Sequence, residues 1–123
     1  ITLLEGDFLE TDVGDEYDIA LISGVVLISS ETVSRRLFGL AYKALTPGGM
    51  VIVQDYMRVD HSPEREKLDT LEDMYVLVAF DSGAGDRDGE EIASWLRDAG
   101  FQNPVMTPLP TQLALVTASK PLI

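Results

Sequence analysis

Two residues are the candidates for acid–base catalysis in this chain, Asp55 and His61. Asp55 stands two positions after the apolar run of residues 50–53, and His61, the single histidine, lies in the segment after it. A histidine suits the role of a general base because its pKa lies near neutral pH; for His61 the alternative is a solvated surface position. Asp55 has three alternatives, which are to act on its own, to bind a substrate hydroxyl group, or to cap the end of a strand.

Two pairs of neighbouring residues are of the kinds expected at a turn that binds a ligand. In Ser23-Gly24, the glycine lets the backbone come close to a ligand or simply permits the turn after a strand. In Asp7-Phe8, which follows Gly6, the aspartate can cap a turn or accept hydrogen bonds, and the phenylalanine can belong to the core. Each pair therefore has both a structural and a functional interpretation.

The segment 17–54 predicts the unit that positions these side chains. Ile19–Ile22 is a short apolar run typical of a strand buried on both faces. An amphipathic segment begins at Ser30 and ends at Thr46–Gly49, a turn of one proline and two glycines. Residues 50–53 form a second apolar strand. Strand, helix and strand predict a βαβ unit whose strands are parallel.

Both candidate positions follow strands of this unit, Ser23-Gly24 after the first and Asp55 after the second. They are therefore expected at the carboxyl edge of the sheet, where open α/β sheets place their ligands. The remaining predicted elements are a strand at residues 1–4, a helix over 68–80, a helix capped by Asp88 that ends at Gly100, and an antiparallel hairpin of strands 104–107 and 112–118. Together they predict a single three-layer α/β domain over residues 1–123.

Composition narrows the classes of function. With 123 residues, a net charge of −12 and no cysteine, the chain has the make-up of one globular domain, and the lack of cysteine favours the cytoplasm. The negative charge argues against binding to nucleic acids or anionic membranes, because both require positive surface. No acid pair joins a histidine at ligand spacing, so we expect no metal site.

Several motifs in a fixed order give a more specific prediction. They are GDF, YDIALISGVV, KALTPGG, MVIVQD and RDAGF, followed by the terminal hairpin. Over essentially the whole chain this order resembles the class I S-adenosylmethionine-dependent methyltransferases, in particular the small-molecule O-methyltransferases. The resemblance begins at the family's third strand. It therefore implies a mostly parallel, Rossmann-like sheet that lacks its first two strands, in a chain that is the C-terminal portion of a catalytic domain.

The resemblance implies S-adenosylmethionine as the cofactor. Asp7 and Phe8 match the family positions that contact the adenine, and Ser23 and Gly24 match the junction beside the methionine part. The family's glycine-rich cofactor loop has no counterpart, since Gly83–Gly85 lies in a late loop. We therefore expect that these 123 residues alone neither bind the cofactor tightly nor turn over.

The resemblance also implies a small organic acceptor methylated on oxygen. Asp55 matches the acid that orients the family's catalytic base. The family's histidine is missing from Val25–Ser30, which leaves His61 as the only histidine. Met74 and Tyr75 fall on the family's substrate-lining helix, although core packing is the alternative for both.

Two other classes of function stay open. The missing histidine favours a methyltransferase-like domain without chemistry that serves in dimerisation or scaffolding, whereas Asp7-Phe8 and Asp55 weigh against it. A nicotinamide-dependent enzyme is disfavoured by the terminal hairpin and the lack of a Tyr-x-x-x-Lys pair. Because the resemblance begins at the family's third strand, the neighbouring strands are missing and Ile19–Ile22 would have an unpaired edge. We expect that residues 1–4 pair with this edge or that two chains associate there as a homodimer.

Overall fold

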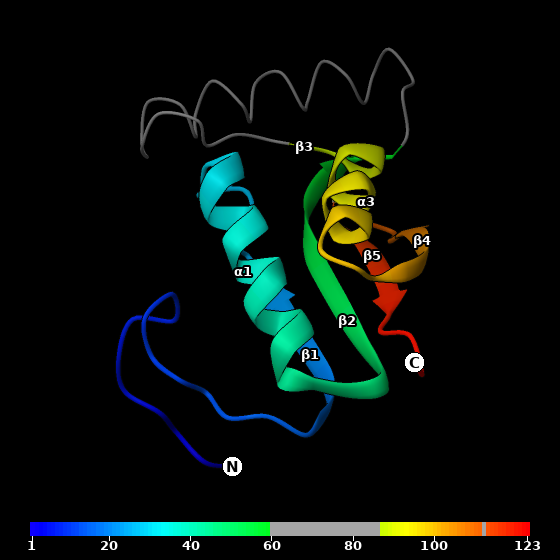
Figure 1. The fold of residues 1–123 in the computed structure, drawn as a ribbon. Helices are drawn as coiled ribbons and strands as arrows, with labels where there is room; N and C mark the ends of the chain where they lie inside the picture. Colours follow the sequence, from blue (N-terminus) through cyan, green and yellow to red (C-terminus); the bar gives the residue numbers. More distant parts are fainter. Residues whose placement is uncertain (60–86, 112) are drawn as a thin grey trace.

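A four-stranded mixed sheet with a short fifth strand organises the chain (Figure 1). The structure, a computed structural model, describes residues 1–59, 87–111 and 113–123. Its elements are β1 (Tyr17–Ser23), α1 (Glu31–Ala44), β2 (Leu45–Arg58), β3 (Arg87–Asp88), α3 (Gly89–Asp98), β4 (Gln102–Pro108) and β5 (Leu113–Ser119). The strand order is β1-β2-β5-β4, and β3 pairs with β2 outside this path.

The strand directions agree with the expected βαβ unit and terminal hairpin. β1 and β2 are parallel, with Ile19 opposite Met50 and Ile22 opposite Val53. β2 pairs with β5 and β5 with β4, both antiparallel. The predicted C-terminal antiparallel hairpin is therefore confirmed. The described strands make two parallel and two antiparallel pairings, so this part of the sheet is not mostly parallel as expected, because β5 lies between β2 and β4.

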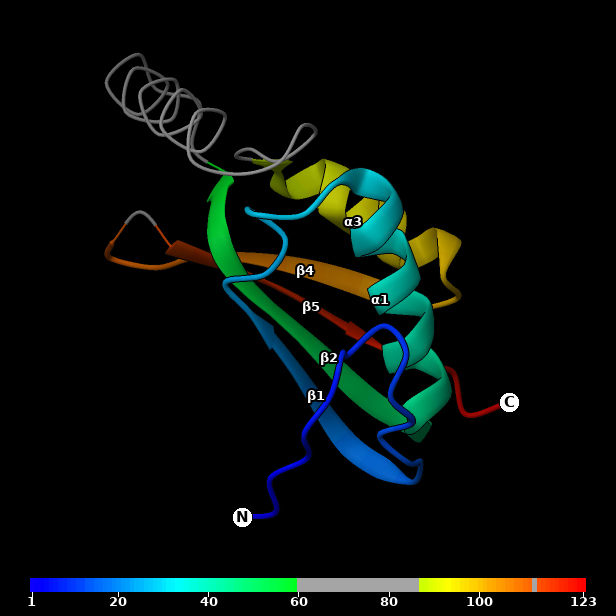
Figure 2. The ribbon, with the colours of Figure 1, turned by 90° about the vertical axis from the view of Figure 1, so that its left-hand side faces the viewer.

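Both described helices cover the same face of the sheet (Figure 2). The strands alternate accordingly: Val51, Val53 and Met57 of β2 and Val116 of β5 are buried, while their neighbours are partly exposed. Phe38 of α1 is completely buried and belongs to the same core. The described residues thus form two layers. The helix expected over 68–80 lies outside the described residues, so the three-layer architecture stays a prediction.

Helix α1 is fixed at both ends by polar contacts. At its start, the Ser30 hydroxyl oxygen accepts a hydrogen bond from the Val33 backbone N–H, a typical N-cap. At its end, the Lys120 ammonium donates to the backbone carbonyls of Tyr42 (2.8 Å) and Leu45 (2.6 Å). A cation at this position satisfies carbonyls that the helix leaves without a partner and opposes the negative end of the helix dipole.

Helix α3 begins and ends as its sequence predicts. The Asp88 carboxylate accepts from the Glu90 backbone N–H at 3.0 Å, which makes Asp88 the N-cap. At the other end Gly100 has a φ of +110° and donates to Arg97 O, while Phe101 N donates to Leu96 O. These two bonds form a Schellman motif, which favours glycine because side-chained residues resist positive φ.

Two expectations about which residues form strands are wrong. Ile1–Leu4 forms no strand and is exposed, and β1 pairs with β2 alone among the described strands. Residues 1–4 therefore do not move in beside β1. Thr46–Gly49, expected as a turn, belongs to β2. Hydrogen bonds from Gly48 N to Lys120 O and from Lys120 N to Gly49 O extend this pairing beyond the apolar run.

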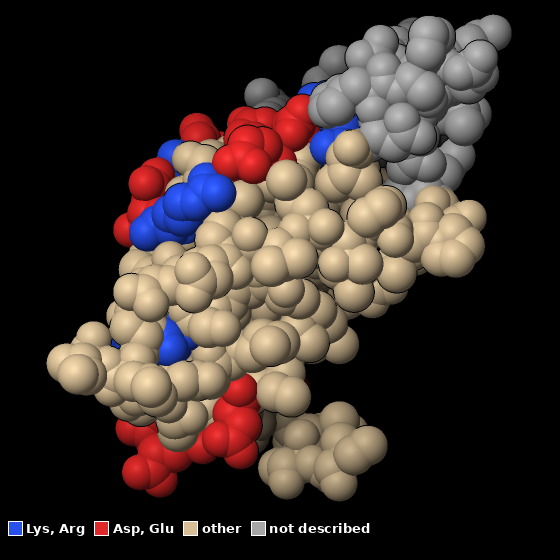
Figure 3. Space-filling model, turned by 90° about the vertical axis from the view of Figure 1, so that its right-hand side faces the viewer, with Lys and Arg blue, Asp and Glu red and all other residues tan. Residues whose placement is uncertain are grey.

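Apolar side chains remain exposed on the strands. Ile19 and Leu21 of β1 are each 62% exposed, and Val105 of β4 is 56% exposed. The expectation that Ile19–Ile22 is buried on both faces is therefore wrong, because both described helices cover the other face of the sheet (Figure 2). Seen from the side on which β4 lies in Figure 1, a broad uncharged surface separates charged groups at the margins (Figure 3). No helix in the described part of the chain has the length and apolar character needed to cross a membrane.

Candidate functional site

The carboxyl ends of β1 and β2 lie side by side and carry the predicted site residues. Ser23 is opposite Gln54 in the parallel register, and the Gly24 N–H donates to Gln54 O at 3.1 Å. Asp55 follows Gln54 within β2. The structure therefore brings Ser23, Gly24 and Asp55 close together, as expected from the βαβ pattern. Asp55, however, was expected after the strand and lies within β2, opposite Ala114 of β5, because pairing with β5 extends β2 to Arg58.

Gly24 occupies a conformation that suits glycine and leaves room beside it. Its φ is +71°, in the left-handed region. A Cβ atom at this position would meet no other atom within 4 Å. Both Gly24 and the preceding Ser23 are exposed. The backbone conformation, rather than a close approach of protein atoms, is therefore what calls for glycine here.

Asp55 is buried, with only 2% of the residue exposed. Its Oδ2 accepts from the Leu27 backbone N–H at 3.1 Å, and its Oδ1 accepts from its neighbour Tyr56 N–H at 2.9 Å. Burial raises the pKa of the Asp55 carboxyl, and the backbone N–H groups of Leu27, Tyr56 and Val26 oppose this increase. This carboxylate thus contacts the backbone of its own strand, at Tyr56, and the backbone of the loop between β1 and α1, residues 24–30.

Arg87 contacts the same loop from β3. Its Nη2 donates to the Ser29 carbonyl oxygen at 3.2 Å. Its guanidinium carbon lies 5.5 Å from the centre of the Trp95 ring, and the guanidinium carbon of Arg35 lies 5.6 Å from the same ring. A cation over an aromatic face is held by the ring quadrupole. In the described part of the chain, the Asp55 carboxylate and the Arg87 guanidinium therefore both contact the loop 24–30.

Asp7 and Phe8 lie in the segment before β1. The Asp7 Oδ1 accepts from Leu9 N–H at 2.9 Å, and its carbonyl accepts from Glu10 N–H and Thr11 N–H. This is the turn-capping role that its sequence allowed. Phe8 is 46% exposed, so it is not a core residue in this structure.

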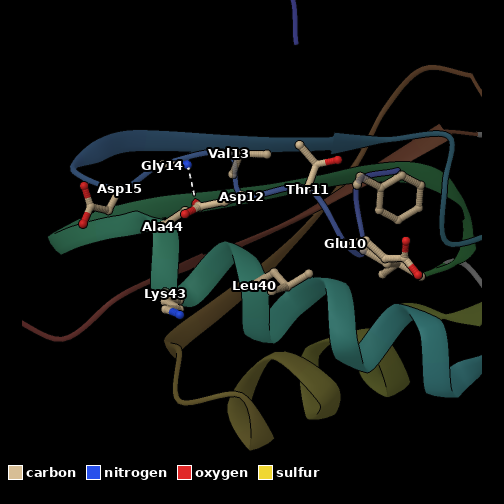
Figure 4. Close-up of a pocket in the computed structure, with 11 residues that line it drawn as sticks. Glu10, Thr11, Asp12, Val13, Gly14, Asp15, Leu40, Lys43 and Ala44 are labelled. Atoms are coloured by element: carbon tan, nitrogen blue, oxygen red, sulfur yellow. Dashed lines mark hydrogen bonds between the residues drawn. The ribbon is translucent and has the colours of Figure 1, made fainter. Parts of the chain in front are cut away.

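Phe8 borders a pocket of about 400 Å³ between residues 8–15 and α1 (Figure 4). From α1 the pocket receives Leu40, Lys43 and Ala44, and on the opposite wall Asp12 accepts a hydrogen bond from Gly14 N–H. Neither Ser23, Gly24 nor Asp55 lines it. The two predicted parts of the cofactor site therefore do not share this pocket.

The other predicted site residues, His61, Met74 and Tyr75, lie outside the described residues. Within the described ranges, no group of three or more histidine, aspartate or glutamate side chains is arranged to hold a metal ion.

Comparison with known proteins decides the family. The sequence matches the O-methyltransferase domain family over residues 1–102. The chain belongs to this family. The resemblance to small-molecule, class I S-adenosylmethionine-dependent methyltransferases is thereby confirmed.

Individual relatives of this O-methyltransferase chain agree with the assignment. It is 29% identical over 119 residues to the 3-amino-4-hydroxybenzoate 4-O-methyltransferase of Streptomyces cremeus, covering 97% of this chain and 32% of the relative. A candidate O-methyltransferase from Nostoc punctiforme has the same fold, with a TM-score of 0.82 at 24% identity, over 95% of this chain and 35% of that chain.

Human N-acetylserotonin methyltransferase, solved with S-adenosylmethionine, also shares the fold. Its TM-score is 0.81 at 21% identity, over 96% of this chain and 33% of that chain. The O-methyltransferase chain spans about a third of the length of these relatives.

Sequence reasoning missed one residue of the site, Arg87. The available signal was a basic residue directly before the N-cap Asp88 and after a glycine-rich stretch in an acidic chain. That signal does not show that Arg87 contacts Ser29, which lies 58 positions earlier in the sequence.

Proposed function

We propose that the protein containing this chain transfers a methyl group from S-adenosylmethionine to an oxygen atom of a small organic molecule. The family match over residues 1–102 carries this proposal. The relative from Streptomyces cremeus methylates the 4-oxygen of 3-amino-4-hydroxybenzoate, which supports a phenolic acceptor. Because the chain spans about a third of such relatives, the activity is proposed for the whole protein.

The carboxyl edge of the sheet is compatible with the proposed cofactor. Ser23 and Gly24 are exposed there, and the space beside Gly24 is open. These two residues would lie against the methionine part of S-adenosylmethionine, and Asp7 and Phe8 would contact its adenine once the remaining part of the domain positions residues 1–16. The cofactor supplies a methyl group bonded to a positively charged sulfur. The chain contributes binding and orientation, which favour an in-line transfer.

We further propose that the protein acts in the cytoplasm as a homodimer, without nucleic-acid or membrane partners. The absence of cysteine and the net charge of −12 support the location and the lack of anionic partners. The exposed Ile19 and Leu21, beside the edge of β1 that pairs with no described strand, support association of protein surfaces.

A second candidate is a methyltransferase-like domain that has lost its chemistry and serves in dimerisation or scaffolding. Two observations favour it: no histidine stands in residues 25–30, and the Asp55 carboxylate contacts backbone N–H groups instead of a basic side chain. This candidate predicts that the whole protein neither binds S-adenosylmethionine nor transfers methyl groups.

Methyl transfer by the whole protein tests the proposal. The whole protein is incubated with S-adenosylmethionine carrying a labelled methyl group and with phenols, anilines and thiols in parallel. We expect label on the oxygen of at least one phenol. Binding of the cofactor without transfer to any oxygen would contradict the acceptor class, and absence of both would favour the scaffold.

A separate calorimetric experiment addresses these 123 residues alone. We expect no cofactor binding in the micromolar range, because the sequence has no glycine-rich loop between a strand and a helix near its start. Micromolar binding would show that the carboxyl edge is sufficient to hold the cofactor.

A further inference from the structure

The loop between β1 and α1 is contacted by two oppositely charged side chains from different strands. The carboxylate of Asp55, a residue of β2, accepts from the Leu27 N–H at 3.1 Å. The Arg87 guanidinium, from β3, donates to the Ser29 carbonyl at 3.2 Å. The two contacted backbone groups are only two positions apart in the loop. An anion thus meets a donor and a cation meets an acceptor, as charge-assisted hydrogen bonds require.

Both charged groups are themselves held in place. Asp55 is buried and also accepts from Tyr56 N–H within its own strand. Arg87 is paired with Met57 in the short parallel ladder between β3 and β2, and its guanidinium lies over the buried Trp95 of α3. Contacts within the protein therefore hold both charged side chains in position.

The loop they hold borders the candidate ligand edge. It begins at the exposed Gly24, directly after Ser23, and ends at Ser30, the N-cap of α1. Between these ends, Val26 is 1% exposed whereas Ile28 is 40% exposed. A shift of the loop backbone would therefore move Gly24 and Ile28 together.

We propose that Asp55 and Arg87 are positioning residues, which clamp the loop 24–30 and so fix the ligand edge for methyl transfer. This inference rests on the proposed function. Asp55 acts through the loop backbone, and Arg87, which no sequence motif singled out, acts with it. The clamp lowers the population of loop conformations that misplace the reacting groups, so its loss affects the transfer step more than cofactor binding.

Hydrogen exchange and kinetics on the whole protein at pH 8 test this clamp. The variants are Asp55→Asn, which keeps the shape but replaces one acceptor oxygen by a donor, and Arg87→Met, which removes the guanidinium. Matched controls are Asp98→Asn and Arg97→Met, which remove exposed charges that form ion pairs with Arg35 and Glu90. Arg87→Lys, which keeps the charge, is a milder variant in case the others fail to fold.

We expect amides of residues 24–30 to exchange at least about tenfold faster in Asp55→Asn and Arg87→Met, because each variant loses a hydrogen bond to a charged group. The controls leave the exchange of this loop unchanged, and Arg87→Lys gives an intermediate rate. In the same two variants kcat falls by about tenfold to a hundredfold, while the KM for S-adenosylmethionine stays near that of the unmodified protein.

Unchanged exchange of residues 24–30 in the Arg87 variants would overturn the clamp, and so would faster exchange with an unchanged kcat. A protein that shows no methyl transfer before any substitution would contradict the proposed function instead. In that case the exchange rates alone still decide whether Asp55 and Arg87 hold the loop.

Discussion

The Asp55 carboxylate and the Leu27 backbone N–H, 28 residues apart in the sequence, are joined by a hydrogen bond of 3.1 Å. This bond connects β2 with the loop that leaves β1. Asp55 is buried, whereas Ser23 and Gly24, where this loop begins, are exposed. The contact thus couples the fold to the proposed ligand site.

The first prediction concerns the pH dependence of stability. Because burial makes the pKa of Asp55 higher in the folded than in the unfolded chain, Asp55 contributes most to stability below its unfolded pKa, at about pH 4. This contribution is lost as the pH rises through the folded pKa. Urea unfolding of the unmodified chain and of Asp55→Asn should therefore show a stability difference that moves in favour of the variant as the pH increases. A difference independent of pH would contradict the raised pKa.

The second prediction concerns Lys120 at the end of α1. Lys120→Met removes two charge-assisted hydrogen bonds to the carbonyls of Tyr42 and Leu45. We expect a loss of about 1 to 3 kcal/mol in the free energy of unfolding. Lys43→Met is the control, since Lys43 is an exposed lysine in the last turn of the same helix.

The control variant Lys43→Met should cost less than about 0.5 kcal/mol, as is usual for surface substitutions. Equal losses in the two variants, measured by urea unfolding, would show that the positive charge near the helix end matters and the two specific hydrogen bonds do not.

The third prediction separates conformation from space at Gly24. Gly24→Ala places no Cβ within 4 Å of other atoms but forces a side-chained residue to a φ of +71°. We expect it to cost about 1 to 2 kcal/mol of unfolding free energy. Gly24→Asn should cost less, because asparagine tolerates the left-handed region better than alanine. A larger loss for Asn than for Ala in chemical unfolding would indicate a steric limit instead.

The fourth prediction concerns association of these 123 residues. β1 pairs with β2 alone among the described strands, and Ile19 and Leu21 are exposed beside its free edge. We expect light scattering to detect dimers or larger species, and the double variant Ile19→Lys, Leu21→Lys to shift the chain towards monomer. Val105→Lys on β4 is the control at the other end of the sheet. A monomeric unmodified chain would contradict this expectation.

Elements defined by local signals were predictable from the sequence. The cap Asp88, the stop at Gly100 and the apolar run Ile19–Ile22 each depend on neighbouring residues, and each appears where expected. Ile1–Leu4 shows the limit, because an apolar segment becomes a strand only beside a partner strand. Thr46–Gly49 shows the converse. These residues have the composition of a turn, but they belong to a strand because Gly48 and Gly49 form backbone hydrogen bonds with Lys120.

The candidate site was predictable only in part, for the same reason. Parallel strands necessarily end at one edge, so the meeting of Ser23, Gly24 and Asp55 followed from the βαβ pattern. The partners of the charged groups did not follow. Leu27 and Ser29 contribute backbone atoms, which carry no sequence signature, and Arg87 reaches Ser29 across 58 positions.

The central claim is that the carboxyl edge of β1 and β2 forms the ligand side of an S-adenosylmethionine-dependent O-methyltransferase. Hydrogen exchange of the whole protein with and without S-adenosylhomocysteine, the product form of the cofactor, tests it most directly. We predict slower exchange in residues 23–30 on binding, and no change in residues 45–49 at the opposite edge. Binding that leaves residues 23–30 unprotected, or that protects residues 45–49 instead, would contradict the claim.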